Sequence, residues 1–533
     1  MHEIKTMLSG SRAHRFILLL LFLVYFVNGV ISIRSNSIVS DETDHLSYGI
    51  RVLSGKPQKV YEDDASTQPV SALNALPRAV EQVLNPGLQK EDGGVSDTKN
   101  GRYISLFICA LIGIYVYKWS SELYGENAGL FSLFLFTFCP NLQANIPLVG
   151  TDAYAVLFTI TSAWYFRRLI LYPTWRTHIL FSLQIGLALV TKQSLFLLPL
   201  IYGIIALGIL FKRRNLKKNI GINFARLGVL TLIVLLVINA AFLFQGTGKS
   251  LAQYEFKSET FQSFQQGFLS KVPVPLPAPF LEGYDGVKYM LSLGSGHGNV
   301  SGRSYLFGEY FTGNSKWYYY SALILFKTPL SVLILLILVL AALFRKPFSR
   351  QRLIDAGYPL GLAFFFLVFI SLTNTSQHSL RHLLMIFPLF YISMGQVVNW
   401  KVRRKKLMLA VIILYGLFGF YRYFPNLISY TNELIWNKTN AYRVLASSNI
   451  DHFQARHSLE KYLQNHPDVK IPGEKPDAGE FIVGINEYLD LKQEKKHDWL
   501  NNFAPYGHVN HCYLLFRITE QDLANKNLIN VER

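Results

Sequence analysis

The amino-acid sequence predicts a polytopic α-helical membrane protein with a small α/β domain at its C-terminus, and three observations favour this fold class. Half of the 533 residues are hydrophobic and only 16% are charged, with a mean hydropathy of +0.23. This is more apolar than a soluble protein of that size can bury. Long apolar runs recur between short basic clusters up to residue 423, and the tail beyond it is mixed and polar.

About eleven apolar stretches are long enough to cross a bilayer. The stretch between residues 178 and 211 is interrupted by Thr191-Lys192-Gln193-Ser194, yet both of its flanks are strongly basic. Basic flanks are typical of cytoplasmic loops, so an even number of crossings must lie between them. We therefore expect spans at about 16–33, 103–118, 126–140, 153–172, 178–191, 194–211, 226–244, 320–344, 356–373, 382–398 and 407–421.

The basic residues set the expected orientation. A net charge of +18 in a soluble protein would suggest nucleic acid, but here the clusters FKRRNLKK, FRKPFSRQR and KVRRKK separate apolar runs, which indicates cytoplasmic loops and no nucleic-acid partner. Lys5, Arg12 and Arg15 precede the first run, which we interpret as a retained anchor rather than a cleaved signal peptide. The N-terminus is then cytoplasmic and the C-terminus extracytoplasmic.

This orientation divides the chain into two parts. Residues 1–423 form the transmembrane domain, with outer loops at 34–101 and 245–319, and residues 424–533 form an extracytoplasmic α/β domain. In that domain, helical spacing at 451–464 and short β-type runs at 480–485 and 512–518 predict the elements. Three cysteines in unrelated contexts imply no disulfide framework.

An acidic segment, Ser40-Asp41-Glu42-Thr43-Asp44-His45, directly follows the first apolar run. Deprotonating a hydroxyl needs a positioned carboxylate, and neighbouring carboxylates can divide the work between proton acceptance and binding of a cation or acceptor. Asp41 and Glu42 are therefore candidate catalytic residues. The alternative is a solvated acidic patch at the end of a membrane helix.

Three more charges stand at predicted outer membrane boundaries: Asp152, Lys192 and Arg381. A charged side chain at such a boundary is energetically costly unless it is paired or hydrated, which favours a functional role for these three residues. Two converging cations would neutralise the charge on a phosphate leaving group. The alternatives are an N-terminal helix cap for Asp152 and snorkelling of a long side chain for Lys192.

The segment GSGHGNVSGRSYLFGEYF contributes His297 and Arg303. Its glycines would let the backbone approach a ligand, although the spacing is no phosphate-loop pattern. Arg303 is a further candidate for the phosphate. His297, with Glu42, is a candidate metal ligand, against the alternative of an ordinary loop histidine.

Several of these motifs, in this order, resemble those of the polyprenyl-phosphate-dependent glycosyltransferases of the GT-C superfamily. The resemblance covers nearly the whole chain and is strongest to bacterial relatives of protein O-mannosyltransferases and of the aminoarabinose transferase that modifies lipid A. The segment leading into the outer domain departs from the family pattern, because His452 and Phe453 stand where Trp-Gly is usual. The motifs are Asp41-Glu42, the stretch ending in Thr151-Asp152, Thr191-Lys192, Trp317-Tyr318-Tyr319-Tyr320, Lys327-Thr328-Pro329 and Arg381 ahead of Pro388.

This resemblance implies a GT-C fold and inverting transfer of a sugar from a polyprenyl-phosphate carrier to an acceptor hydroxyl of a protein, lipid or glycan. Asp41 would take the acceptor proton, Asp152 and Glu42 would position the acceptor or a divalent ion, and Lys192 and Arg381 would hold the phosphate. A divalent cation is compatible with this scheme but not required. We expect a bacterial inner membrane. The rival interpretations are a lipid-linked sugar transporter and an inactive relative that binds the donor.

Overall fold

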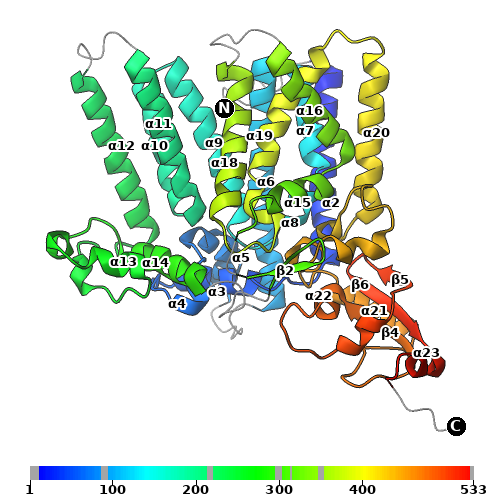
Figure 1. Ribbon diagram of the computed structural model, residues 1–533. Helices are drawn as coiled ribbons and strands as arrows, with labels where there is room; N and C mark the ends of the chain where they lie inside the picture. The colour runs from blue at the N-terminus through cyan, green and yellow to red at the C-terminus, as the bar shows by residue number, and fades with distance from the viewer. Residues whose placement is uncertain are drawn as a thin grey trace.

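Long helices run side by side as a bundle, and most of the shorter polar elements gather at one of its ends (Figure 1). The computed structural model describes residues 11–85, 94–212, 220–293, 303–312, 315–345 and 353–528. Most of the basic segment FKRRNLKK and His297 lie outside these residues.

All eleven predicted apolar stretches are helical. Five of the described helices are long and apolar enough to cross a membrane alone, and the bent pair α15 and α16 adds a sixth if it is one span. The chain is therefore a multi-pass helical protein, and the number of eleven crossings stays a prediction. The helices are α2 (Arg12–Ser35), α6 (Val95–Tyr124), α7 (Glu126–Thr137), α9 (Asp152–Leu171), α10 (Trp175–Leu189), α11 (Leu197–Lys212), α12 (Ile220–Ala241), α15 (Tyr319–Lys327), α16 (Leu330–Arg345), α18 (Tyr358–Thr373), α19 (Ile386–Met394) and α20 (Lys405–Tyr423).

The predicted span 320–344 is not one straight helix, because the chain bends by 118° between α15 and α16. Pro329 has no backbone N–H and disfavours helical geometry at the residue before it, which ends α15. At the break, the buried Lys327 ammonium donates to three backbone carbonyl oxygens between Ile428 and Asn449. The broken helix is thus tied to the segment that follows α20.

The two predicted outer loops meet at the lower end of the bundle in Figure 1. Asp285 is fully buried and joins them, since its carboxylate accepts from the Tyr61 hydroxyl at 2.7 Å and from the backbone N–H groups of Lys257 and Ser258 at 2.8 and 2.9 Å. The elements at this end include α3 (Glu42–Leu53), α4 (Tyr61–Asp64), α5 (Ala72–Leu84), α8 (Pro140–Asn145), α13 (Glu259–Phe264), α14 (Ala278–Leu293), β1 (Ser304–Leu306) and β2 (Glu309–Phe311).

The C-terminal part holds a four-stranded sheet in the order β3-β4-β6-β5, beside the same end of the bundle. Strands β3 and β4 are parallel, and the β4–β6 and β6–β5 pairs are antiparallel. The buried apolar core continues from α2 through the bundle to β6, so the sheet packs onto the rest of the chain. The elements are α21 (Arg456–Asn465), β3 (Val469–Lys470), β4 (Gly479–Gly484), α22 (Ile485–Tyr488), β5 (Gly507–Val509), β6 (Tyr513–Ile518) and α23 (Glu520–Asn525).

Candidate active site

Asp41 stands immediately before α3, shortly after the first membrane helix ends. Its Oδ2 lies 2.5 Å from a guanidinium nitrogen of Arg381, and its Oδ1 lies 3.0 Å from Nε2 of His452. Burial alone would raise the pKa of Asp41, but Arg381 and His452 outweigh it and hold the pKa well below its ordinary value. Each oxygen of the predicted base thus lies within 3.0 Å of a side-chain nitrogen.

Arg381 lies in a short 3-10 helix, Leu380–Leu383, between α18 and α19. Asn449 fixes the entry to this helix, because its Oδ1 accepts from the Leu380 N–H at 2.9 Å and its Nδ2 donates to the His378 carbonyl at 3.0 Å. The segment that carries His452 therefore also positions Arg381, and Asp41 contacts both.

A second ion pair joins two other predicted site residues. Asp152 begins α9, Lys192 follows α10, and Nζ of Lys192 lies 2.6 Å from Oδ1 of Asp152. Asp152 also interacts electrostatically with Arg381. We call Asp41, Arg381, Asp152 and Lys192 the charged cluster. All four were expected from the sequence, and the fold brings them together from four separate parts of the chain.

Three histidines surround the charged cluster. His45, on α3, interacts electrostatically with all four of its members, and burial lowers the pKa of this histidine. Nδ1 of His382 accepts from Asn374 at 2.8 Å, which leaves the ring proton on Nε2. Burial, with Arg381 nearby, lowers the pKa of His378 to about 4. These rings are neutral at pH 7, so they add polarity to the site without adding charge.

Glu42 takes a different position from its neighbour Asp41. Its side chain is only 1% exposed, and its two oxygens contact the Arg102 guanidinium at 2.7 and 2.5 Å. The same oxygens accept from the backbone N–H groups of Val39 and Val149, each at 2.9 Å. A role for Glu42 in holding a cation or acceptor remains a prediction, and these contacts argue instead that it joins α3 to α6.

The other two predicted residues are not placed in the charged cluster. Arg303 packs over the ring of Tyr310 and donates to the backbone carbonyl of Asp490 at 2.7 Å, so it contacts the C-terminal part. His297 lies outside the described residues. Within the described part of the chain, no three His, Cys, Asp or Glu side chains form a group that could hold a metal ion.

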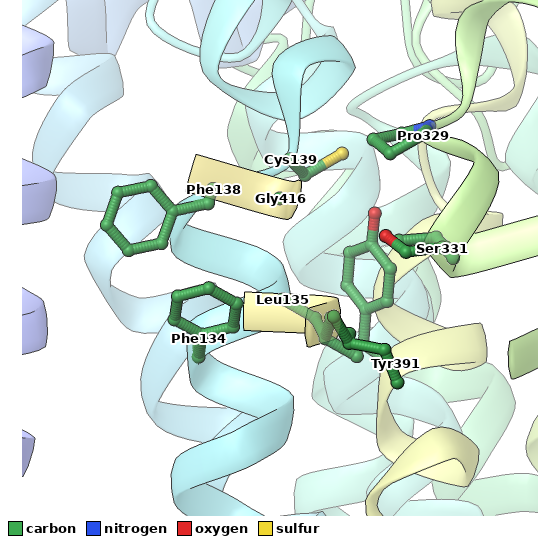
Figure 2. A pocket seen from close by; sticks show the side chains of 10 residues that line it. Phe134, Leu135, Phe138, Cys139, Pro329, Ser331, Tyr391 and Gly416 are labelled. Carbon is green, nitrogen blue, oxygen red and sulfur yellow. The ribbon is translucent and has the colours of Figure 1, made fainter. Parts of the chain in front are cut away.

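A small pocket lies apart from the charged cluster, among the helices of the bundle (Figure 2). Aromatic and aliphatic side chains dominate its wall, with Cys139, Ser331 and Tyr391 as the polar members. None of the four cluster residues lines it. The remaining lining residues are Phe134, Leu135, Phe138, Pro329, Val332, Ile412 and Gly416.

Residues 95–239 match the family model of the dolichyl-phosphate-mannose-protein mannosyltransferases. This match confirms the resemblance to GT-C glycosyltransferases. The matched region contains Asp152 and Lys192 of the charged cluster, whereas Asp41 and Arg381 lie on either side of it. A comparison with curated proteins finds no match.

Solved structures of an oligosaccharyltransferase and of ArnT are distantly similar. The oligosaccharyltransferase of Archaeoglobus fulgidus, in complex with Zn and sulfate, is 12% identical with a TM-score of 0.43, and the similarity covers 75% of this chain and 51% of that one. This chain thus spans about half the length of that protein. ArnT from Cupriavidus metallidurans, bound to undecaprenyl phosphate, is 10% identical with a TM-score of 0.33, covering 93% and 97%.

Proposed function

We propose that this chain is an inverting glycosyltransferase that moves a sugar from a polyprenyl-phosphate carrier to an acceptor hydroxyl at the outer face of a membrane. The observation that carries the proposal is the charged cluster, in which two carboxylates and two cations meet at the polar end of the bundle. The match to a dolichyl-phosphate-mannose family supports a lipid-linked donor. The acceptor would be a protein, lipid or glycan.

In the proposed reaction, the phosphate of the donor binds between Lys192 and Arg381. The acceptor hydroxyl gives its proton to Asp41 and attacks the anomeric carbon from the side opposite the phosphate. The bond between the anomeric carbon and the phosphate oxygen breaks, and polyprenyl phosphate leaves with its charge held by the two cations. A single displacement of this kind inverts the anomeric configuration.

In the proposed reaction, Lys192 and Arg381 hold the charge of the leaving phosphate, and a divalent metal ion is not required. If one takes part, it would act as an additional Lewis acid at the phosphate. Transfer measured with and without EDTA separates the two schemes. We expect unchanged transfer when EDTA is added.

The first experiment is mass spectrometry of products after purified protein meets a mixture of polyprenyl-phosphate sugars and a membrane extract. We expect the wild type to consume one donor and release polyprenyl phosphate. Asp41→Asn should release at least about 100-fold less, since it removes the proton acceptor. Asp477→Asn, an exposed carboxylate of the C-terminal part, is the matched control and should behave as wild type.

The same experiment separates the rival classes. A transporter in proteoliposomes would move the intact donor across the bilayer without releasing polyprenyl phosphate. A binding protein would retain donor on a filter and leave it unchanged. Either result from folded wild-type protein, over a broad panel of donors, would contradict the transferase proposal.

A further inference from the structure

Arg381 has two partners in the proposed reaction and contacts one of them in this structure. In this structure Arg381 pairs with Asp41, whereas in the proposed reaction it binds the donor phosphate. We propose that the donor phosphate takes Arg381 away from Asp41, and that His452 then holds the freed carboxylate in place for the acceptor hydroxyl. This inference rests on the proposed function and adds an order to it, because the donor must bind before Asp41 can act.

Asp41 is poorly suited to accept a proton while it is paired. Arg381 occupies Oδ2 at 2.5 Å and His452 contacts Oδ1 at 3.0 Å. A carboxylate stabilised in this way is a weak base, because its charged form is already satisfied. Removing one of the two partners exposes an oxygen to the acceptor and strengthens the base.

The Asp41–Arg381 pair is open to exchange, in contrast to its neighbour in sequence. Its side chains are 28% and 24% exposed, whereas those of the Glu42–Arg102 pair are 1% exposed on both sides. A planar guanidinium binds phosphate through two parallel hydrogen bonds, which lets the phosphate compete with a single carboxylate contact. Lys192 supplies a second positive charge near Arg381, because both cations interact electrostatically with the ring of His382.

His452 is held by contacts that do not involve the Arg381 side chain, so it can stay when the guanidinium group moves. The histidine is 4% exposed, and its backbone N–H donates to Oε1 of Gln454 at 2.7 Å. Gln454 in turn donates to the hydroxyl of Ser429 and the carbonyl of Ile450. Nε2 of His452 also lies 3.0 Å from the hydroxyl of Ser40. His452 is therefore a positioning residue for Asp41.

The exchange is tested by binding, without turnover, using undecaprenyl phosphate as the probe. If Asp41 and phosphate compete for Arg381, Asp41→Asn should bind the probe about three- to tenfold tighter than wild type, as expected for loss of one partly exposed ion pair. Arg381→Gln should bind it more weakly. Unchanged or weaker binding by Asp41→Asn would overturn the exchange.

Asp44→Asn is the matched control for charge. Asp44 lies one turn along α3, is exposed, and interacts electrostatically with Asp41. Its neutralisation removes the same charge nearby without freeing Arg381, so affinity should stay within about twofold of wild type. Equal tightening by Asp44→Asn and Asp41→Asn would show general electrostatics and refute the competition. Absence of any binding by wild type would overturn the proposed function and this inference together.

The role of His452 is tested by turnover of undecaprenyl-phosphate mannose or whichever panel donor the wild type consumes. His452→Ala should lower kcat about tenfold or more with KM little changed, because Asp41 loses its remaining support. His452→Gln keeps an N–H donor of similar reach and should restore most of kcat. Wild-type kcat in His452→Ala, or equal losses in both variants, would overturn the positioning role while leaving the transferase proposal intact.

Discussion

Lys192 provides the positive charge of the second ion pair in the charged cluster, and its side chain is 19% exposed. Lys192→Met should lower kcat/KM for release of polyprenyl phosphate about 100-fold, the usual effect of removing one group that stabilises a developing anion. Lys56→Met, an exposed lysine of the predicted outer loop 34–101, is the control and should retain wild-type activity. A Lys192→Met enzyme within about threefold of wild type would contradict phosphate binding by Lys192.

At the residue scale, all four members of the charged cluster could be identified from the sequence, because a charged side chain at the end of an apolar run costs free energy and so indicates a functional role. The ion pairs within the cluster could not be predicted, since they join residues that are distant in sequence: Asp152 and Lys192 are 40 positions apart, and Asp41 and Arg381 are hundreds apart. His452 was noticed as a departure from the family pattern, but only the fold places it against Asp41. The ion pair of Glu42 with Arg102 could not be predicted either, because adjacent residues at the start of a helix point in different directions, and the role of Glu42 in binding stays a prediction.

At the scale of elements, the buried Glu42–Arg102 pair joins the start of α3 to α6. Arg102→Met leaves a buried carboxylate without its cation, which should reduce stability by about 3–5 kcal/mol, whereas removing both partners should restore part of the loss. Thermal unfolding in detergent measures this. Arg517→Met breaks an exposed pair with Glu480 and should change stability by less than about 1 kcal/mol. An unchanged Tm in Arg102→Met would rule out this structural role.

The segment between α20 and α21 should impose a pH dependence on stability. Burial, with Glu487 nearby, raises the pKa of Asp451 from 3.8 to about 6. A raised pKa in the folded state contributes stability below pH 4 that is lost as pH rises through 6, because the buried carboxyl must then ionise. Asp451→Asn removes this loss.

We therefore expect Asp451→Asn to increase the free energy of unfolding at pH 7.5 by up to about 3 kcal/mol, which raises Tm. Near pH 4 the substitution should leave Tm unchanged. Thermal unfolding at both values in the same detergent is the measurement. A gain of equal size at both pH values would show that the effect does not come from ionisation of Asp451.

Helices were more predictable than the connections between them. Apolar runs bounded by charges predicted helices because a lipid-facing backbone must satisfy its hydrogen bonds within the segment. The sequence predicts one span over 320–344, without the 118° bend at Pro329, although Lys327 and Thr328 interrupt the apolar run just before it. A proline inside the run was the available signal. The contact between the outer loops through Asp285 has no local signature and appears only in the fold.

The orientation of the whole molecule is the last prediction. Positive residues favour a cytoplasmic N-terminus, and Figure 1 shows α3, α4, α13 and α14 at the same end of the bundle as the C-terminal sheet, so these elements should all be extracytoplasmic. The native cysteines Cys109, Cys139 and Cys512 are buried, so a membrane-impermeant maleimide should react little with them. An introduced cysteine at an exposed position then reports its side of the membrane.

Asp477→Cys, on the C-terminal part, should be labelled in intact bacterial spheroplasts. Lys401→Cys, in the exposed basic segment before α20, should be labelled only after the membrane is permeabilised. The unsubstituted protein, with its buried cysteines, gives the background. The reverse pattern would place the charged cluster on the cytoplasmic side, where nucleotide sugars are available and a lipid-linked donor would lose its physical rationale. This measurement therefore tests the orientation on which the proposed chemistry depends.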